Sequence, residues 1–298
     1  MSLTSIAGVR VGHWTHDVAQ TGCTVVIPPT PNVAYAEVRG AAPGSRELSL
    51  LGAGMSVQQV SAIVLTGGSA FGLAAADGVM AGCEDDGVGH PTPGGVVPIV
   101  PAAVIYDLMV GDGSIRPIAA NGRAAYEDAS DRPVLSGPFG AGAGATVAKW
   151  RGPDATRPSG IGSGLMATGG VQVAALSVVN ALGDVYRLDG TPLTDGPGMG
   201  REPTNPPMLP GPDGILTNTT LVCVITDAVA DRTVLSRLAI RAHDAMGAMI
   251  APVHTRFDGD TVFVISTGQA GPAQEELLGE AVFLAVADSI SAAVESRG

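Results

Sequence analysis

The segment TNTTLVCVITDA places Asn218, Thr219 and Thr220 directly before an apolar run. The ordinary interpretation is a turn followed by a threonine that begins a strand. A chemical interpretation is that a threonine hydroxyl attacks the carbonyl of Asn218, breaks the chain and exposes a new terminal threonine. A threonine hydroxyl is a poor nucleophile without a base beside it, and a free α-amine, with an ordinary pKa of about 8, is such a base. The residue types are compatible with both interpretations.

The segment HTRFDGDTVFVISTG holds two carboxylates, Asp258 and Asp260, separated by one glycine. One interpretation is a hairpin turn before a strand at 261–266. A metal site formed with His254 is the least favoured interpretation, because it offers only three ligands in one loop. The third interpretation is that the two carboxylates approach a buried hydroxyl and orient its proton transfer, one of them with a raised pKa.

Other polar residues stand out singly. Lys149 is the only lysine among the 16 Lys and Arg residues, and it follows the glycine-rich run 140–145, which favours a role for a titratable amine or a point charge. Tyr106 and Asn180 each end an apolar run. The turn at 67–72 fits neither the dinucleotide-binding nor the nucleophile-elbow pattern, so only its backbone amides are candidates, for a small anion or an oxyanion.

The elements that must position these residues are visible as apolar patterns. Short β-branched runs bounded by Gly, Pro, Asn or Asp predict strands at 23–27, 62–65, 171–179, 221–226 and 261–266. The runs 171–179 and 221–225 are almost wholly apolar, which predicts strands buried on both faces. Helical periodicity predicts helices at 72–81, 232–249 and 272–294. Together these elements indicate an α/β or α+β architecture.

A proline- and glycine-rich segment, 189–217, precedes the candidate cleavage site. A connection of this length without secondary structure is uncommon inside a domain, and it is usually a functional or disordered loop. An ordinary surface loop is one interpretation. The other is a mobile loop that delivers a peptide bond to the rigid end of a strand.

Composition excludes several classes of protein. With 298 residues, 45% of them hydrophobic and 15% charged, the chain is expected to be globular. A formal charge of −12 argues against a nucleic-acid partner, which would require clustered Lys and Arg. Neither a secretory signal nor an apolar stretch free of Gly, Pro and charge is evident, so we expect no membrane span and a cytoplasmic location. Three cysteines, odd in number and far apart, predict buried reduced thiols.

Taken in order, seven segments resemble the L-aminopeptidase/D-esterase family of self-processing peptidases, which includes β-peptidyl aminopeptidases and nylon-oligomer hydrolases. They are GVRVGHW, LTGGSAFGL, PIVPAAVIYDL, GAGAGATVAKW, VVNALGDV, NTTLVCVITDA and HTRFDGDTVFVIST. Each segment is short, but seven in the same order, spread over nearly the whole chain, make a specific resemblance.

The resemblance implies one self-processing domain, 1–298, with an α+β fold: a four-layer αββα sandwich of the N-terminal-nucleophile hydrolase type, whose connectivity ornithine acetyltransferases share. It implies cleavage between Asn218 and Thr219 into an α chain, 1–218, and a β chain, 219–298, which stay associated. A homo-oligomer of these processed units, a tetramer, is expected.

The resemblance also implies roles for six residues and no need for a metal or an organic cofactor. They are Thr219 as nucleophile, Asp258 and Asp260 as the pair that orients it, Asn180 as oxyanion donor, Lys149 as an electrostatic aid, and Tyr106 as a further active-site position. The expected activity is an aminopeptidase or amidase that forms an acyl-enzyme with short peptides, amides or esters. The acidic pair and the negative net charge are compatible with a substrate's free ammonium group.

Three alternatives remain. The aminopeptidase branch uses a Ser nucleophile with a Ser and a Glu, whereas the Thr219, Asp258 and Asp260 set is more similar to the nylon-oligomer branch, which favours an endo-acting hydrolase of ω-amino-acid oligomers. An acyltransferase related to ornithine acetyltransferase is the second alternative. A non-catalytic small-molecule-binding protein of the same fold is the third.

Overall fold

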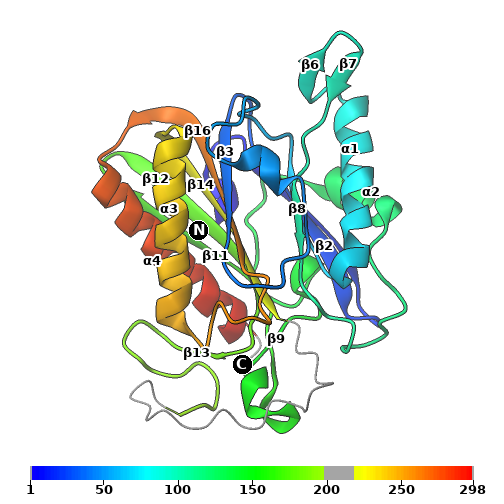
Figure 1. The fold of residues 1–298 in the computed structure, drawn as a ribbon, viewed down its shortest axis with the longest axis vertical. Helices are drawn as coiled ribbons and strands as arrows, with labels where there is room; N and C mark the ends of the chain where they lie inside the picture. The colour runs from blue at the N-terminus through cyan, green and yellow to red at the C-terminus, as the bar shows by residue number, and fades with distance from the viewer. Residues whose placement is uncertain (1, 198–217, 297–298) are drawn as a thin grey trace.

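The computed structural model describes residues 2–197 and 218–296 and arranges them around two five-stranded sheets (Figure 1). The first sheet has the order β1-β2-β5-β8-β4 and the second has the order β11-β12-β14-β16-β3. Both are mixed, since β5 runs parallel to β8 and β14 runs parallel to β16, while their other pairs are antiparallel.

The strands of the first sheet are β1 (Arg10–His16), β2 (Thr21–Ile27), β4 (Ser45–Arg46), β5 (Ile63–Thr66) and β8 (Ala102–Val104). Those of the second are β3 (Val33–Val38), β11 (Ile161–Thr168), β12 (Val171–Asn180), β14 (Thr219–Val229) and β16 (Thr261–Pro272). Short pairs are formed by β6 (His90–Thr92) with β7 (Gly95–Val97), β9 (Thr146–Val147) with β10 (Arg157–Pro158), and β13 (Asp184–Val185) with β15 (Ile250–Ala251).

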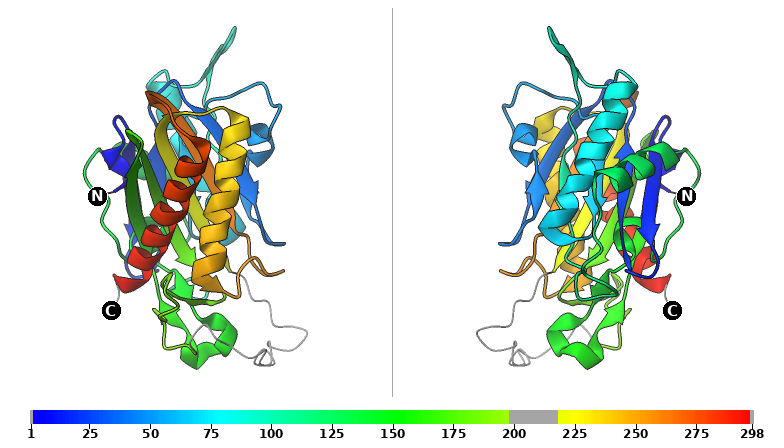
Figure 2. Two further views of the ribbon diagram at one scale, coloured as in Figure 1. Left: turned by 90° about the vertical axis from the view of Figure 1, so that its left-hand side faces the viewer. Right: turned by 90° about the vertical axis from the view of Figure 1, so that its right-hand side faces the viewer.

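A pair of helices packs on each sheet. Helices α1 (Ala75–Asp85) and α2 (Ala119–Asp128) cover the first sheet, and α3 (Arg232–Met249) and α4 (Glu275–Glu295) cover the second. Figure 2 shows the two helix pairs on opposite sides of the molecule. A further apolar cluster, which includes Leu65, Leu176 and Phe263, joins the facing sides of the two sheets. The Ala, Val, Leu and Ile side chains of the sequence are thus divided among three buried clusters, and the fold is of the predicted α+β kind.

All five predicted strands and all three predicted helices are present. The near-continuous burial of β12 and β14 confirms the prediction that these strands are buried on both faces. The helix predicted at 72–81 is displaced, because a 3-10 turn at Ser69–Ala74 precedes α1. The hairpin interpretation of Asp258-Gly259-Asp260 is wrong, since this loop joins β15 to β16, and β16 pairs with β14 and β3 instead.

Helix α4 is long and apolar enough to cross a membrane by length and composition, with a mean hydropathy of 1.7, but 61% of that stretch is buried within the protein. It lies against β11, where Gly162 and Gly164 permit close approach. A Cβ on either glycine would come within 2.2–2.3 Å of the carbonyl oxygen of Ser289 or Ala285. These contacts identify α4 as a core helix of the second sheet.

The three cysteines, Cys23, Cys83 and Cys223, are free and buried, as predicted. Burial raises the pKa of Cys23 and of Cys223 to about 12 and that of Cys83 to about 11. All three therefore remain protonated thiols at neutral pH and act as small apolar side chains.

The predicted loop 189–217 lies partly outside the described residues, which end at Pro197 and resume at Asn218. Its described beginning is held by Asp184, which is fully buried and accepts a hydrogen bond from Thr194 Oγ1 (2.6 Å). The same carboxylate accepts bonds from the indole of Trp150 (2.7 Å) and the guanidinium of Arg151 (2.9 Å). Asp184 thus joins the start of the loop to the turn that carries Lys149.

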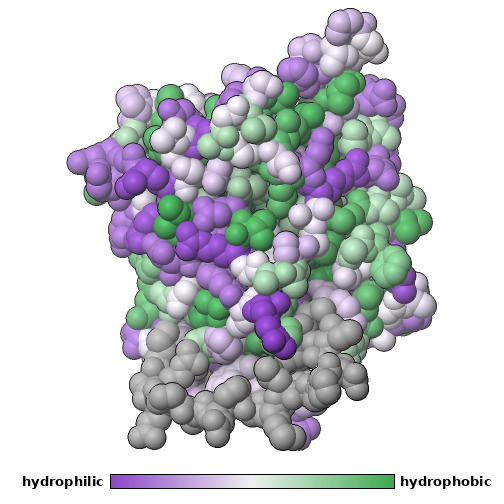
Figure 3. Space-filling view, viewed as in Figure 1, coloured by the Kyte–Doolittle hydropathy of each residue, from purple (hydrophilic) through white to green (hydrophobic). Residues whose placement is uncertain are grey.

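The surface visible in Figure 3 mixes hydrophilic and hydrophobic residues over its coloured part. Large exposed apolar side chains are distributed over several elements of the described chain, including Val18, Phe71, Met109 and Leu135. Scattered apolar residues of this kind are ordinary on a protein surface.

Candidate active site

Three strand ends of the second sheet meet at one place. Thr219, the first residue of β14, lies opposite Asn180, the last residue of β12. On the other side of β14, the loop before β16 reaches Asn218, which forms a parallel bridge with Asp258. The apolar strands therefore carry a polar cluster at their ends, and five of the six predicted catalytic residues lie in it through side-chain or strand contacts.

The peptide carbonyl of Asn218 is held by two donors. The Thr219 hydroxyl, 5% exposed as a residue, donates from Oγ1 to the Asn218 oxygen at 2.5 Å. The backbone N–H of Gly259 donates to the same oxygen at 2.9 Å. A Cβ on Gly259 would lie 2.9 Å from Thr219 Oγ1, so the absence of a side chain there lets the loop approach. The arrangement polarises the carbonyl that the adjacent hydroxyl would attack.

The two predicted carboxylates flank Gly259 and are buried, 2% exposed for Asp258 and 1% for Asp260. Asp260 Oδ1 accepts the backbone N–H of Thr220 at 2.7 Å, and Asp258 Oδ2 accepts that of Thr255 at 2.7 Å. Burial, together with the charge of Asp260, raises the pKa of Asp258 to about 6. The raised pKa expected for one member of the pair is found at Asp258.

His254 also belongs to this cluster, because both its ring and its backbone contact Asp260. Its Nδ1 lies 2.7 Å from Asp260 Oδ2, and its backbone N–H donates to the same oxygen at 3.1 Å. Within residues 2–197 and 218–296, no group of three or more His, Cys, Asp and Glu side chains is placed to hold a metal ion.

Asn180 is fully buried and held on both sides of its amide. Its Oδ1 accepts hydrogen bonds from Lys149 Nζ (2.8 Å) and from the backbone of Thr146 (3.1 Å), and its Nδ2 donates to the Tyr106 carbonyl (3.1 Å). The predicted residue Tyr106 thus reaches the cluster through its backbone. One Nδ2 hydrogen is committed to Tyr106, and the second makes no hydrogen bond to the residues that the structure describes.

Lys149 lies beside Asn180 and donates to its backbone oxygen at 3.0 Å as well as to its side chain. Burial lowers the pKa of Lys149 to about 7, and the nearby charges of Asp258 and Asp107 oppose that shift. A lysine with this pKa is only partly charged at neutral pH, in agreement with the expectation of a titratable amine.

Three backbone amides of the glycine-rich turn at 67–72, the candidate anion-binding segment, donate hydrogen bonds to other parts of the protein. The amide of Gly67 donates to the Gly22 carbonyl (2.8 Å), and that of Ser69 donates to the Ile105 carbonyl (3.0 Å). The amide of Gly68 donates to Asp107 Oδ1 at 2.7 Å. These three amides are therefore occupied by the protein itself.

Sequence reasoning did not single out Asp107 or the partnership of His254 with Asp260. Asp107 is 2% exposed, and burial raises its pKa although the Thr21 hydroxyl and the Gly68 amide both donate to it. Its position after Tyr106 at the end of an apolar run was the available signal. In the sequence, His254 stands out only as a possible metal ligand.

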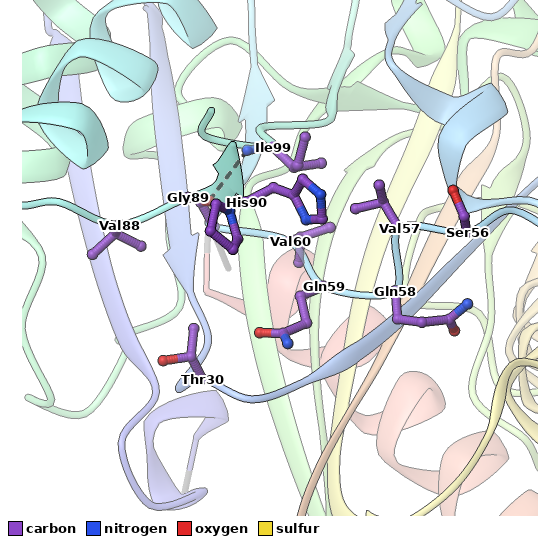
Figure 4. A pocket seen from close by; sticks show the side chains of 12 residues that line it. Thr30, Ser56, Val57, Gln58, Gln59, Val60, Val88, Gly89, His90 and Ile99 are labelled. Atoms are coloured by element: carbon purple, nitrogen blue, oxygen red, sulfur yellow. Dashed lines mark hydrogen bonds between the residues drawn. The ribbon is translucent and has the colours of Figure 1, made fainter. Parts of the chain in front are cut away.

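A cavity of about 240 Å³ lies apart from this cluster, between residues 56–61 and 88–91 (Figure 4). Its polar lining includes Gln58, Gln59 and His90. None of the six predicted catalytic residues lines this cavity.

The family model "Peptidase family S58" matches residues 1–296. An uncharacterised aminopeptidase of Mycobacterium leprae is 41% identical over 292 residues, covering 90% of this chain and 78% of the relative. A 6-aminohexanoate-oligomer endohydrolase of Agromyces sp. is 30% identical over 278 residues, covering 88% and 74%.

Solved structures with the same fold are more distant in sequence. A β-aminopeptidase of Burkholderia sp. superposes with a TM-score of 0.73 at 21% identity, covering 99% of this chain and 85% of the other. The L-aminopeptidase D-Ala-esterase/amidase of Ochrobactrum anthropi, described as a variant of the Ntn hydrolase fold, gives 0.72 at 20% identity with the same coverage. The family resemblance seen in the seven sequence segments is confirmed, and this chain belongs to peptidase family S58.

Proposed function

We propose that the protein is an aminopeptidase-like amide hydrolase that generates its own nucleophile by cutting the bond between Asn218 and Thr219. The observation that carries this proposal is the Asn218 carbonyl, which receives the Thr219 hydroxyl and the Gly259 N–H on one oxygen. A hydroxyl adjacent to a polarised carbonyl, with buried carboxylates on either side of the donor glycine, suits an attack of this kind.

In the cleavage step, Thr219 Oγ1 forms a bond to the carbonyl carbon of Asn218 and the Asn218–Thr219 C–N bond breaks. The hydroxyl proton passes to the nitrogen that leaves, which becomes the α-amine of Thr219. Water then hydrolyses the resulting ester, restoring the hydroxyl and leaving a carboxylate on Asn218. The products are chains 1–218 and 219–298.

In turnover, the same hydroxyl attacks a substrate carbonyl, and the freed α-amine of Thr219 takes the proton. The second Nδ2 hydrogen of Asn180 is the proposed donor to the oxyanion, because Lys149 and Tyr106 fix the orientation of that amide. The amine or alcohol of the substrate leaves, and water releases the acyl group. Lys149 contributes a partial positive charge, and Asp258 and Asp260 orient the terminal threonine.

The proposed substrates are short peptides, amides or esters with a free amine. Support comes from the family and from the mycobacterial relative, which is named an aminopeptidase. The buried acidic pair offers negative charge to an ammonium group. The second candidate is endo-acting hydrolysis of ω-amino-acid oligomers, favoured by the Thr219, Asp258 and Asp260 set and by the relatives named 6-aminohexanoate-oligomer endohydrolase.

The two sheets and their helix pairs support the four-layer αββα arrangement of a single domain, 1–298. We propose further that processed units assemble into a cytoplasmic homo-oligomer.

The decisive experiment is the intact mass of freshly purified protein under denaturing conditions. Two species, the smaller beginning Thr219-Thr220-Leu221, are expected for the natural chain, and one species is expected for Thr219→Ala. A Thr219→Ala variant that is still cut and still active would overturn the assignment. Hydrolysis of N-blocked amides in preference to free-amine amides would replace the aminopeptidase activity with the endo-acting one.

A further inference from the structure

His254 makes two contacts with one oxygen of the buried Asp260 carboxylate. Its backbone N–H donates to Asp260 Oδ2 at 3.1 Å, and its ring Nδ1 lies 2.7 Å from the same atom. An ionised carboxylate can only accept a hydrogen bond, so beside it the ring would donate from Nδ1. The other oxygen, Asp260 Oδ1, accepts the backbone N–H of Thr220 at 2.7 Å. One buried carboxylate therefore joins His254 to the residue that follows the proposed nucleophile.

The backbone of His254 is held in an unusual conformation to make this contact. Its φ is +54°, in the left-handed region that side chains with a Cβ rarely adopt. Such conformations persist where surrounding contacts hold them, and they cluster at functional sites. In this conformation, the backbone N–H and the ring of His254 both contact the same oxygen of Asp260.

The rest of the imidazole has no competing polar contact in the described chain. Its Nε2 is buried without a hydrogen-bond partner there, and the ring edge packs on His243 with centroids 4.9 Å apart. His243 is 2% exposed, and burial lowers its pKa to about 3, so it packs as a neutral ring. Among the residues that the structure describes, Asp260 is thus the polar group that orients the ring of His254.

We propose that His254 is a positioning residue for the reaction, acting through Asp260 to hold the Thr220 amide and with it the direction of the Thr219 hydroxyl. The inference rests on the proposed function of Thr219. Before cleavage, Thr219 is held by peptide bonds on both sides. After cleavage it is a chain end, and the Thr220 hydrogen bond to Asp260 becomes a principal restraint on it. His254 therefore matters most in turnover.

The test compares His254→Gly with His254→Asn. Glycine adopts a positive φ freely and asparagine tolerates it better than most side chains do, and the two differ in that asparagine retains a side-chain N–H donor. His243→Leu is the control, because it removes the neighbouring ring without touching Asp260. The readouts are kcat and KM on free-amine aminoacyl p-nitroanilides, intact mass, thermal unfolding, and hydrogen exchange of the Thr220 amide by mass spectrometry.

We expect His254→Gly to be processed but to lose about 100-fold in kcat, the usual effect of a small misplacement of a reacting group, with KM within about threefold. Exchange of the Thr220 amide should be faster in this variant. His254→Asn should recover most of the kcat and the protection, and His243→Leu should match the natural protein. An unchanged kcat in His254→Gly, or a His254→Asn variant of equal stability with no recovery, overturns the inference.

Failure of the proposed function has a different signature. In that case Thr219→Ala hydrolyses the anilides as well as the natural protein does. The exchange measurement does not depend on activity, so unaltered protection of Thr220 in His254→Gly would by itself overturn the positioning role. The two failures are therefore distinguishable.

Discussion

Replacing Asp258 with asparagine is expected to stabilise the fold at neutral pH while removing a carboxylate to which the proposed mechanism gives a role. Asp258 is 2% exposed, and burial with the charge of Asp260 raises its pKa from 3.8 to about 6. Between these two values the folded protein retains a proton that the unfolded chain has lost. Stability therefore falls as pH rises through this window, because ionisation is easier in the unfolded state.

The magnitude follows from the size of the shift. One pKa unit corresponds to about 1.4 kcal/mol, so a shift of about two units removes about 3 kcal/mol of stability between about pH 4 and pH 6. That loss persists above pH 6. Asparagine retains an oxygen that can accept the Thr255 N–H, which donates at 2.7 Å to Asp258 Oδ2. Asp258→Asn should therefore gain up to about 3 kcal/mol at pH 7 and almost nothing near pH 4.

The assay is urea unfolding of Thr219→Ala against Thr219→Ala/Asp258→Asn at several values between pH 4 and pH 8. The Thr219→Ala background keeps both proteins as one uncut chain, so that processing does not confound the comparison. Two free energies of unfolding that run parallel across this range would show that ionisation of Asp258 does not lower the stability of the folded protein.

Two further substitutions test other parts of the molecule. Asn180→Ala should lower kcat by about 100- to 1000-fold in processed protein, which is the usual effect of removing an oxyanion donor. Steady-state kinetics measure this loss, and a loss below tenfold would contradict the role of Asn180 as the donor. Arg232→Met should lower the free energy of unfolding by more than about 3 kcal/mol. The reason is that the guanidinium of Arg232, 6% exposed, donates to the carbonyls of Ala34, Gly52, Met55 and Val57, and methionine would lose all of these hydrogen bonds from a charged donor. Urea unfolding checks it, and Arg232→Lys should rescue little, since a lysine cannot reproduce the planar fork.

Elements with a strong local apolar pattern could be predicted from the sequence, whereas elements that depend on long-range packing could not. Apolar runs located β12 and β14, and periodicity located α3 with its observed bounds, Arg232–Met249. Strand β3 was missed, because its alternating residues are only partly buried at the edge of a sheet. Helix α2 was missed as well, since AANGRAAYED has little apolar periodicity.

The residues of the candidate site also fall into those that the sequence could identify and those that it could not. Asp258 and Asp260 could be chosen from the sequence because two acids beside a hydroxyl-bearing strand suggest proton transfer. The register that sets Thr219 opposite Asn180 could not, since it arises from pairing between distant segments. Asp107 was hidden for a similar reason: its hydrogen bonds come from Thr21 and Gly68, which only the assembled first sheet brings to it.

The strand order of the second sheet has a consequence for a chain cut before Thr219. Strands β14 and β16 belong to the C-terminal fragment, yet they lie between β12 and β3 of the N-terminal fragment. The fragments would be interleaved, with paired ladders at both edges, so they would remain a permanent heterodimer rather than exchange partners on dilution. Unfolding would then separate them, and recovery would become a bimolecular event that depends on concentration. Cleavage would thus turn a folding reaction that is independent of protein concentration into an assembly reaction that depends on it.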